Sequence, residues 1–229
     1  MLKFTSIATA AVLVAGSTSA ATLTVDFEEF ERGDVLTSID IGGVATTITT
    51  TGGGSGNSGD VVVFDSTQPG SSADGDPDLG APFTSADGDV LNPGNVLIIG
   101  EAPGADGGPD TNPDDNGGGG QITFDFLTAV TFNGFDVLDD VTNFSVFSNL
   151  GTIISGISLD ENNEFASFTG FDAEGITSLT FDFGNASGAI DNLSFTVAAV
   201  PLPASLTLLL AGLGGLGVAS RRRKNAAAA

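Results

Sequence analysis

The sequence predicts an all-β protein, an antiparallel jelly-roll-like β-sandwich flanked by an N-terminal signal peptide and a C-terminal transmembrane helix. Three observations predict this. Between residues 23 and 197, β-branched and aromatic residues alternate with small polar ones, as in half-buried strands. No segment in that range shows the apolar stripe of an amphipathic helix. The two ends are instead continuous apolar runs next to basic residues.

Residues 1–20 show the features of a secretory signal peptide in the usual order. Lys3 supplies the positive start, residues 7–15 form a short apolar run, and residues 18–20 are small enough for cleavage. The alternative is a buried N-terminal strand, which does not require that order. We therefore expect residues 1–20 to direct export.

Alternation is clearest in residues 23–27, 121–126 and 179–183. In the second of these, Ile and Phe residues point to one face, while Thr123 and Asp125 point to the other. Strands with one apolar and one wet face are what a sandwich needs. The other expected strands are residues 45–50, 61–64, 95–99, 130–138, 143–147, 152–159, 164–171 and 189–197.

One folded domain is expected at residues 21–199, interrupted by a Gly/Asp/Pro-rich loop region at 65–120. Seven of the nine prolines fall between Pro69 and Pro113. Only residues 95–99 of this region are expected to bury a face. Loops of this length usually carry function or are disordered.

The charge of this domain is strongly acidic. All 29 acidic residues lie in it against one basic residue, Arg32, which gives a formal charge of −28. Such a field repels phosphate backbones, so nucleic acid is excluded as a partner. It also attracts cations. Because repulsion among the acidic residues destabilises a compact state, a divalent metal is the expected neutralising partner.

Missing residue types exclude several chemistries. Without Cys or His the chain has no disulfide, no imidazole or thiolate zinc site, and no catalytic pair based on those side chains. Carboxylate pairs are the chemistry of glycosidases, but among 29 acidic residues some fall at catalytic spacing by chance. No basic or aromatic groups line up with them to bind a substrate, so we expect no enzyme.

The loop region holds the main candidate metal ligands, and calcium is the expected ion because it binds several carboxylate and carbonyl oxygens. The spacing of these aspartates differs from that of an EF-hand loop, so no known loop type is implied. The alternative is a solvated acidic loop without metal. The candidate ligands are Asp65, Asp74, Asp76, Asp78, Asp114 and Asp115.

Residues 200–224 form the second targeting segment. An uncharged stretch from residue 201 to 220 contains a predicted transmembrane helix at residues 205–220. A basic cluster follows, which should stay cytoplasmic and leave the acidic domain outside. The motif residues are Val200, Pro201, Leu202, Pro203 and Ala204, and the cluster is Arg221, Arg222, Arg223 and Lys224.

This order of Val-Pro-Leu-Pro-Ala motif, apolar helix and basic cluster resembles the PEP-CTERM class of bacterial sorting signals. The resemblance implies processing by an exosortase-type membrane protease. It places the chain at the inner membrane during sorting, and then at the cell surface or in the extracellular matrix. A permanent single-span anchor is the alternative.

A second resemblance concerns residues 26–28 and 189–193, which are similar to the first and last strands of jelly-roll carbohydrate-binding modules. In those modules an acidic residue of the first strand and an Asp of the last hold a structural calcium. The matching positions here are Glu28 and Asp191, with Asp26 as a further candidate. The chain departs from the modules in having no Trp or Tyr for sugar stacking.

The sequence thus predicts a non-enzymatic exported protein of the cell surface or matrix, with calcium ordering its acidic loops. The main alternative is a carbohydrate-binding module for the cell's own extracellular polysaccharide. A secreted hydrolase is a weaker alternative.

Overall fold

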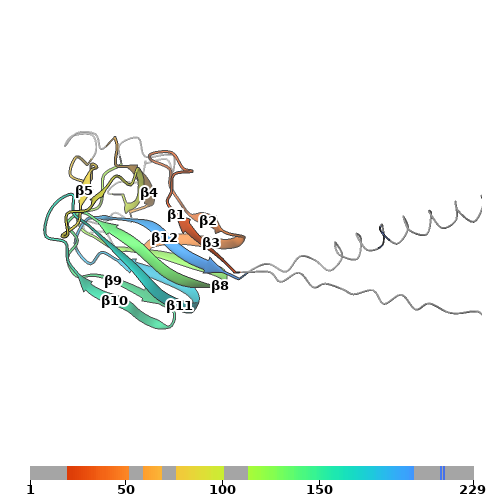
Figure 1. The fold of residues 1–229 in the computed structure, drawn as a ribbon. Helices are drawn as coiled ribbons and strands as arrows, with labels where there is room; N and C mark the ends of the chain where they lie inside the picture. Colours follow the sequence, from red (N-terminus) through yellow and green to blue (C-terminus); the bar gives the residue numbers. More distant parts are fainter. Residues whose placement is uncertain are drawn as a thin grey trace, which may run out of the picture. The chain divides into compact units, whose positions relative to one another are not determined.

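The computed structural model describes residues 20–51, 59–68, 76–100 and 113–198, together with Gly212 and Gly214. Residues 20–198 form one compact unit, which is the body of the protein (Figure 1). Its strands are β1 (Ala21–Val25), β2 (Ser38–Ile41), β3 (Val44–Thr51), β4 (Val61–Asp65), β5 (Phe83–Thr84), β6 (Val90–Leu91), β7 (Asn95–Ile99), β8 (Gln121–Leu138), β9 (Phe144–Ser148), β10 (Gly151–Ile157), β11 (Phe165–Asp182) and β12 (Ala189–Val197).

Ten of these strands form one continuous sheet, in which all pairs are antiparallel, and β5 pairs with β6 in a separate ribbon. The two longest strands, β8 and β11, lie at the centre and pair along most of their length. Residues 121–126 of β8 pair with β3, whereas residues 131–138 pair with β12. The two halves of β8 therefore belong to two different groups of strands.

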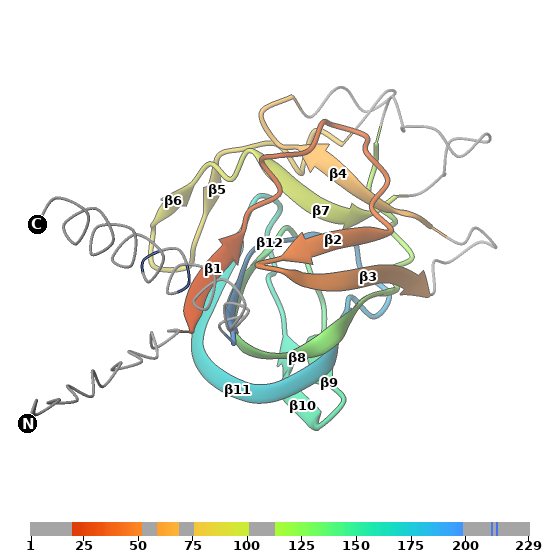
Figure 2. The same cartoon turned by 90° about the vertical axis from the view of Figure 1, so that its right-hand side faces the viewer.

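The sheet folds over because β8 and β11 bend, and both curve strongly (Figure 2). Pairing between them shifts register between Thr169 and Ser178, as it does at β-bulges that turn a strand from one layer to another. The first layer contains β10, β9, residues 178–182, residues 121–126, β3 and β2. The second layer contains residues 165–176, residues 130–138, β12, β7, β4 and β1.

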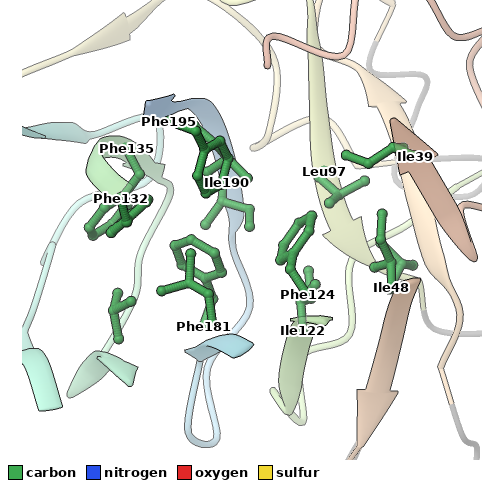
Figure 3. Close-up of a cluster of buried hydrophobic side chains, with 14 of the residues drawn as sticks. Ile39, Ile48, Leu97, Ile122, Phe124, Phe132, Phe135, Phe181, Ile190 and Phe195 are labelled. Atoms are coloured by element: carbon green, nitrogen blue, oxygen red, sulfur yellow. The ribbon is translucent and has the colours of Figure 1, made fainter. Parts of the chain in front are cut away.

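Phenylalanine rings join the two layers in the main core (Figure 3). Phe181 of the first layer lies 5.4 Å from Phe135 of the second between ring centroids, at 71°. Phe126 and Phe195 make a similar cross-layer contact at 5.4 Å. Edge-to-face pairs at such distances stabilise beyond the area that they bury. The alternation predicted for residues 121–126 is confirmed, since Ile122, Phe124 and Phe126 are buried.

A second apolar cluster covers the other face of β4 and β7. It contains Leu79 and Phe83, both fully buried, from the region predicted to be a loop. The prediction that only residues 95–99 of that region bury a face is therefore wrong. Two isolated apolar residues among Gly, Asp and Pro show no periodicity, so the pattern gave no signal of their burial.

The remaining strands agree with the all-β prediction with specific exceptions. The prediction misses strands β2, β5 and β6, because alternations of two to four residues are too short to detect. β8 and β11 were each predicted as two strands. The predicted first strand lies two residues too late, and Phe27 instead adopts a positive φ of 56°.

The predicted helix at 205–220 lies outside the described residues apart from Gly212 and Gly214, both helical. In the part of the chain that the structure describes, no helix has the length and apolar character needed to span a membrane.

Candidate metal centre

Three of the predicted ligands converge at one point of the body. Oxygen atoms from the carboxylates of Asp76, Asp114 and Asp115 all lie within 4.8 Å of one another. Asp76 is 4 % exposed and Asp115 8 % exposed. Within the described ranges this is the one group of three acidic side chains with such close oxygens. Hard cations are bound by oxygen clusters of this type.

Apolar anchors and backbone contacts bring these segments together. Leu79 and Phe83 attach the segment after Asp76 to the second cluster, and Leu79 N donates to Asp76 Oδ1 at 3.3 Å. Asp115 forms an isolated antiparallel bridge with Gly100 at the end of β7. Its Oδ2 accepts a 2.6 Å hydrogen bond from Gly188 N at the start of β12.

Asp78 and Asp139 extend this group. Asp139 is 3 % exposed and adopts a positive φ of 72° directly after β8. The amide of Asn163 holds the segment of Asp78 in place by donating to the carbonyls of Asp78 and Gly80. Asn163 N also donates to Asp139 Oδ1 at 3.4 Å. We call Asp76, Asp78, Asp114, Asp115 and Asp139 the loop cluster.

Ionisation of the carboxyls in the loop cluster is electrostatically unfavourable. Burial, and then contacts with Asp78 and Asp115, raise the pKa of Asp76. Burial and the charge of Asp139 likewise raise the pKa of Asp115. Burial raises the pKa of Asp139 to about 6, with the charge of Asp78 adding to it. Buried charges normally have a partner of opposite charge.

Protein cations do not fill that role. Arg32 is the one basic residue between residues 20 and 198. Partial burial raises the pKa of Asp65. Hydrogen bonds from Thr67 and Gln68, together with the charge of Arg32, outweigh this and lower the pKa below its usual value. Asp65 is therefore held in its own turn and does not join the loop cluster. Asp74, also predicted, lies outside the described residues.

A second acidic group surrounds Asp191 on β12. Asp191 is 1 % exposed, and its Oδ1 is buried without a hydrogen-bond partner. Burial raises the pKa of Asp191 to about 8, a hydrogen bond from the Asn192 backbone lowers it, and the charges of Asp136, Asp26 and Glu28 raise it further. We call Asp26, Glu28, Asp136 and Asp191 the strand cluster. It brings together the two predicted residues Glu28 and Asp191.

Sequence reasoning missed two buried members of these groups. Asp139 follows a predicted strand, where an Asp is an ordinary turn residue. Nothing in the sequence distinguishes it from the exposed aspartates. Asp136 lies in an alternating strand, where Asp is expected on a wet face. Its pairing with Asp191 across β8 and β12 depends on strand order, which the sequence does not specify locally.

Both clusters offer only oxygen ligands. Such sets suit calcium, magnesium or manganese, and not zinc or copper, which take nitrogen or sulfur. The residues present therefore fit a hard divalent cation, and the deeply buried carboxylates are a chemical reason for one.

The end of the chain matches a known protein-sorting motif. Residues 199–224 match the PEP-CTERM protein-sorting motif, which confirms the sequence prediction for the tail. The chain is thus an exported protein carrying the sorting signal that an exosortase recognises. Proteins with this signal are typically cargo and not enzymes. No curated protein matches the chain.

Proposed function

We propose that this chain is a non-enzymatic exosortase cargo whose acidic jelly-roll-like body serves at the cell surface or in the extracellular matrix with calcium bound. The observation that carries the proposal is the loop cluster, where Asp76, Asp114 and Asp115 converge within 4.8 Å. A bound calcium ion would neutralise the cluster, because it replaces repulsion among buried carboxylates with ligand bonds.

Calcium is favoured over magnesium by the nature of the ligand segments. Calcium accepts six to eight oxygens in flexible geometry, whereas magnesium requires a near-ideal octahedron and keeps several waters. The loop cluster draws its carboxylates from three separate stretches of chain: 76–78, 114–115 and 139. Backbone carbonyls and water complete the shell in such irregular sites.

The strand cluster is proposed as a second calcium site. Asp191 Oδ1 is a buried carboxylate oxygen without a partner, which is a costly arrangement unless a ligand satisfies it. Glu28 and Asp26 are exposed, so the cluster opens to solvent on their side. Glu28 is held in place because its Oε1 accepts a 2.7 Å hydrogen bond from Asn95 N.

Polysaccharide binding is the second candidate function, and a groove favours it. Residues of β2, β3 and β8 line an open groove of about 640 Å³. Asp40, Thr47 and Asp125 supply oxygens for sugar hydroxyls, and Leu127 beside them is 80 % exposed. Such a surface binds sugars by hydrogen bonds and an aliphatic contact, because the chain has no Trp or Tyr to stack on them.

Isothermal titration calorimetry of the body, residues 20–198, with CaCl₂ tests the main proposal. We expect saturable binding in the wild type and loss of a site in the double variant Asp76→Asn, Asp115→Asn. Amides keep the shape of the side chains but remove two charges from the loop cluster. The matched control is Asp125→Asn, an exposed carboxylate of β8 outside both clusters, which should bind as the wild type does.

Absence of any calcium heat and of any melting shift would contradict the proposal. Loss of binding in the Asp125 variant to the same extent would show only a diffuse charge effect. Binding of the cell's own polysaccharide that Asp40→Asn weakens would favour the second candidate. Hydrolysis of that polysaccharide by the purified body would overturn the non-enzymatic assignment.

A further inference from the structure

Each acidic cluster has a residue or a hydrogen bond at the beginning of the last strand, β12. Asp115 of the loop cluster accepts a hydrogen bond from Gly188 N, one residue before β12 begins. Asp191 of the strand cluster is the third residue of β12. The first residues of this strand therefore lie beside one buried carboxyl group of each cluster.

The strand cluster places two carboxyl groups opposite each other in a sheet, and they carry like charges once both are ionised. Asp191 and Asp136 are direct cross-strand partners in the antiparallel pairing of β12 with β8. Opposed residues have Cβ atoms about 5 Å apart, and like charges at such positions destabilise the pairing. Both side chains are buried, Asp136 being 9 % exposed and Asp191 1 % exposed. Solvent therefore screens their repulsion poorly.

Among the described residues, the side chain that bridges the two carboxyl groups is a neutral amide. Asn192 Nδ2 donates to Asp136 Oδ2 at 2.8 Å and to Asp191 Oδ2 at 3.1 Å. The positive φ of 51° at Asn192 marks the irregularity that turns its amide toward them. One amide cannot cancel two charges, and Asp191 Oδ1 is left without a partner.

Docking of β12 closes the second layer. β12 pairs with β8, with β7 and with β1, and β1 has β12 as its one partner among the described strands. In contrast, β9 and β10 pair with each other and with residues 179–182 of β11, without β12. Strands β7 and β4 also join the sheet through β12, so the pairing pattern separates a unit of β1, β12, β7 and β4 from the first layer.

We propose that a divalent cation bound by Asp136 and Asp191 acts as a latch that docks β12, and with it β1, onto β8. This inference rests on the proposed function, since it assigns a consequence to calcium in the strand cluster. With the cation bound, the opposed carboxylates attract a common partner and β12 stays paired. Without it, β12 and β1 open while the first layer keeps its pairing.

The latch has a clear place in export. β1 begins directly after the predicted signal peptide, and β12 ends three residues before Val200 of the sorting motif. The strands that the cation would hold are thus the ones joined to the two export segments. A latch that needs calcium closes after the body has left the cytoplasm.

Amide hydrogen exchange on the body, with CaCl₂ or with EGTA, tests the latch at pH 9, because burial raises the pKa of Asp191 to about 8 and its carboxyl is ionised only above that value. In EGTA we expect amides of β12 and β1 to exchange at least tenfold faster, while amides of β9 and β10 change little. Asp136→Asn and Asp191→Asn should each restore slow exchange of β12 in EGTA, because either removes the like-charge pair. Two variants are used so that misfolding of one does not decide the result. Asp87→Asn, at an exposed position outside both clusters and outside the groove, should behave as the wild type.

Three outcomes overturn the latch. If the amides of β12 exchange at the same rate with CaCl₂ and with EGTA, the latch is wrong. If calcium nevertheless raises the melting temperature, the proposed calcium binding is retained. Uniform acceleration in all strands shows that the ion stabilises the whole body and not this unit. If β12 exchanges faster in EGTA and neither Asn variant slows it again, the pair of Asp136 and Asp191 is not the cause of the faster exchange.

Discussion

Asp115 Oδ2 accepts a 2.6 Å hydrogen bond from Gly188 N, 73 residues further along the chain. The bond joins the segment after β7 to the start of β12. It requires close packing at Gly188, which adopts a φ of 139° that side chains other than glycine rarely reach.

Replacing Gly188 by Ala should therefore be strongly destabilising. The new Cβ would come within 2.6 Å of Val141 Cγ1 and 2.9 Å of Leu138 O. Backbone strain and the clash together should cost about 2 kcal/mol or more in the free energy of unfolding, measured by urea denaturation. The matched control is Gly88→Ala, with a φ of 87° and no atom within 4 Å. It should lose only about 1 kcal/mol. Equal losses would show that packing around Gly188 contributes nothing.

In the absence of calcium, the body should become less stable as pH rises from about 4 to 8. Burial raises the pKa of Asp139 to about 6 and that of Asp191 to about 8 in the folded state. Above the unfolded value of 3.8 the unfolded chain has lost these protons while the folded body keeps them. Stability from these groups is then lost as pH passes each folded pKa. Urea midpoints in EGTA at pH 5 and 8 measure the effect.

Saturating calcium should remove or reverse this slope, because ligand carboxylates are ionised when the ion is bound. The variant Asp191→Asn should flatten the part of the slope near pH 8 in EGTA. A midpoint that rises with pH in EGTA would contradict the assignment of these carboxyls as buried and protonated.

The main core should depend on Phe181, which contacts rings of both layers. It lies 5.8 Å from Phe124 and 5.4 Å from Phe135 between centroids, and it is fully buried. Phe181→Ala should cost about 3–5 kcal/mol in the free energy of unfolding. Phe181→Leu should cost less and keeps the test valid if the Ala variant does not fold. Leu127→Ala, at an 80 % exposed position, should stay within about 0.5 kcal/mol of wild type.

The fold class was predictable because it depends on local alternation. Residues 189–197 were predicted as a strand and form β12 with those bounds. The continuity of β8 was not predictable, since Leu127 and its two followers are exposed and break the buried pattern while staying extended. Nothing in residues 127–129 marks a bend between two layers.

The candidate site was predictable only as a set of residue types. The density of Asp around positions 76 and 114 indicated hard-cation ligands, and the structure brings Asp76, Asp114 and Asp115 together. Asp136 could not be selected, because its importance comes from the partner that faces it on β12. Cross-strand neighbours depend on the order of strands in the sheet, and a single sequence carries no direct signal of that order.

Sorting should depend on the tail and not on the body. Replacing Pro201 and Pro203 by Ala should block processing and leave a longer, membrane-associated form, detected by immunoblot of cell fractions. Asp76→Asn should leave processing unchanged, because it lies outside residues 199–224. Normal processing of the Pro201, Pro203 variant would mean that the protease does not read this motif.

Thermal unfolding of the body at pH 7.5, first with excess calcium and then with EGTA, decides whether the body is stabilised by calcium. A ligand at about 100 times its dissociation constant stabilises by roughly 2.7 kcal/mol. For a domain of this size that corresponds to a rise in melting temperature of roughly 5–10 °C. We expect calcium to raise the melting temperature of the wild type by this amount and that of the Asp76→Asn, Asp115→Asn variant by less. Identical melting temperatures with calcium and with EGTA would contradict it.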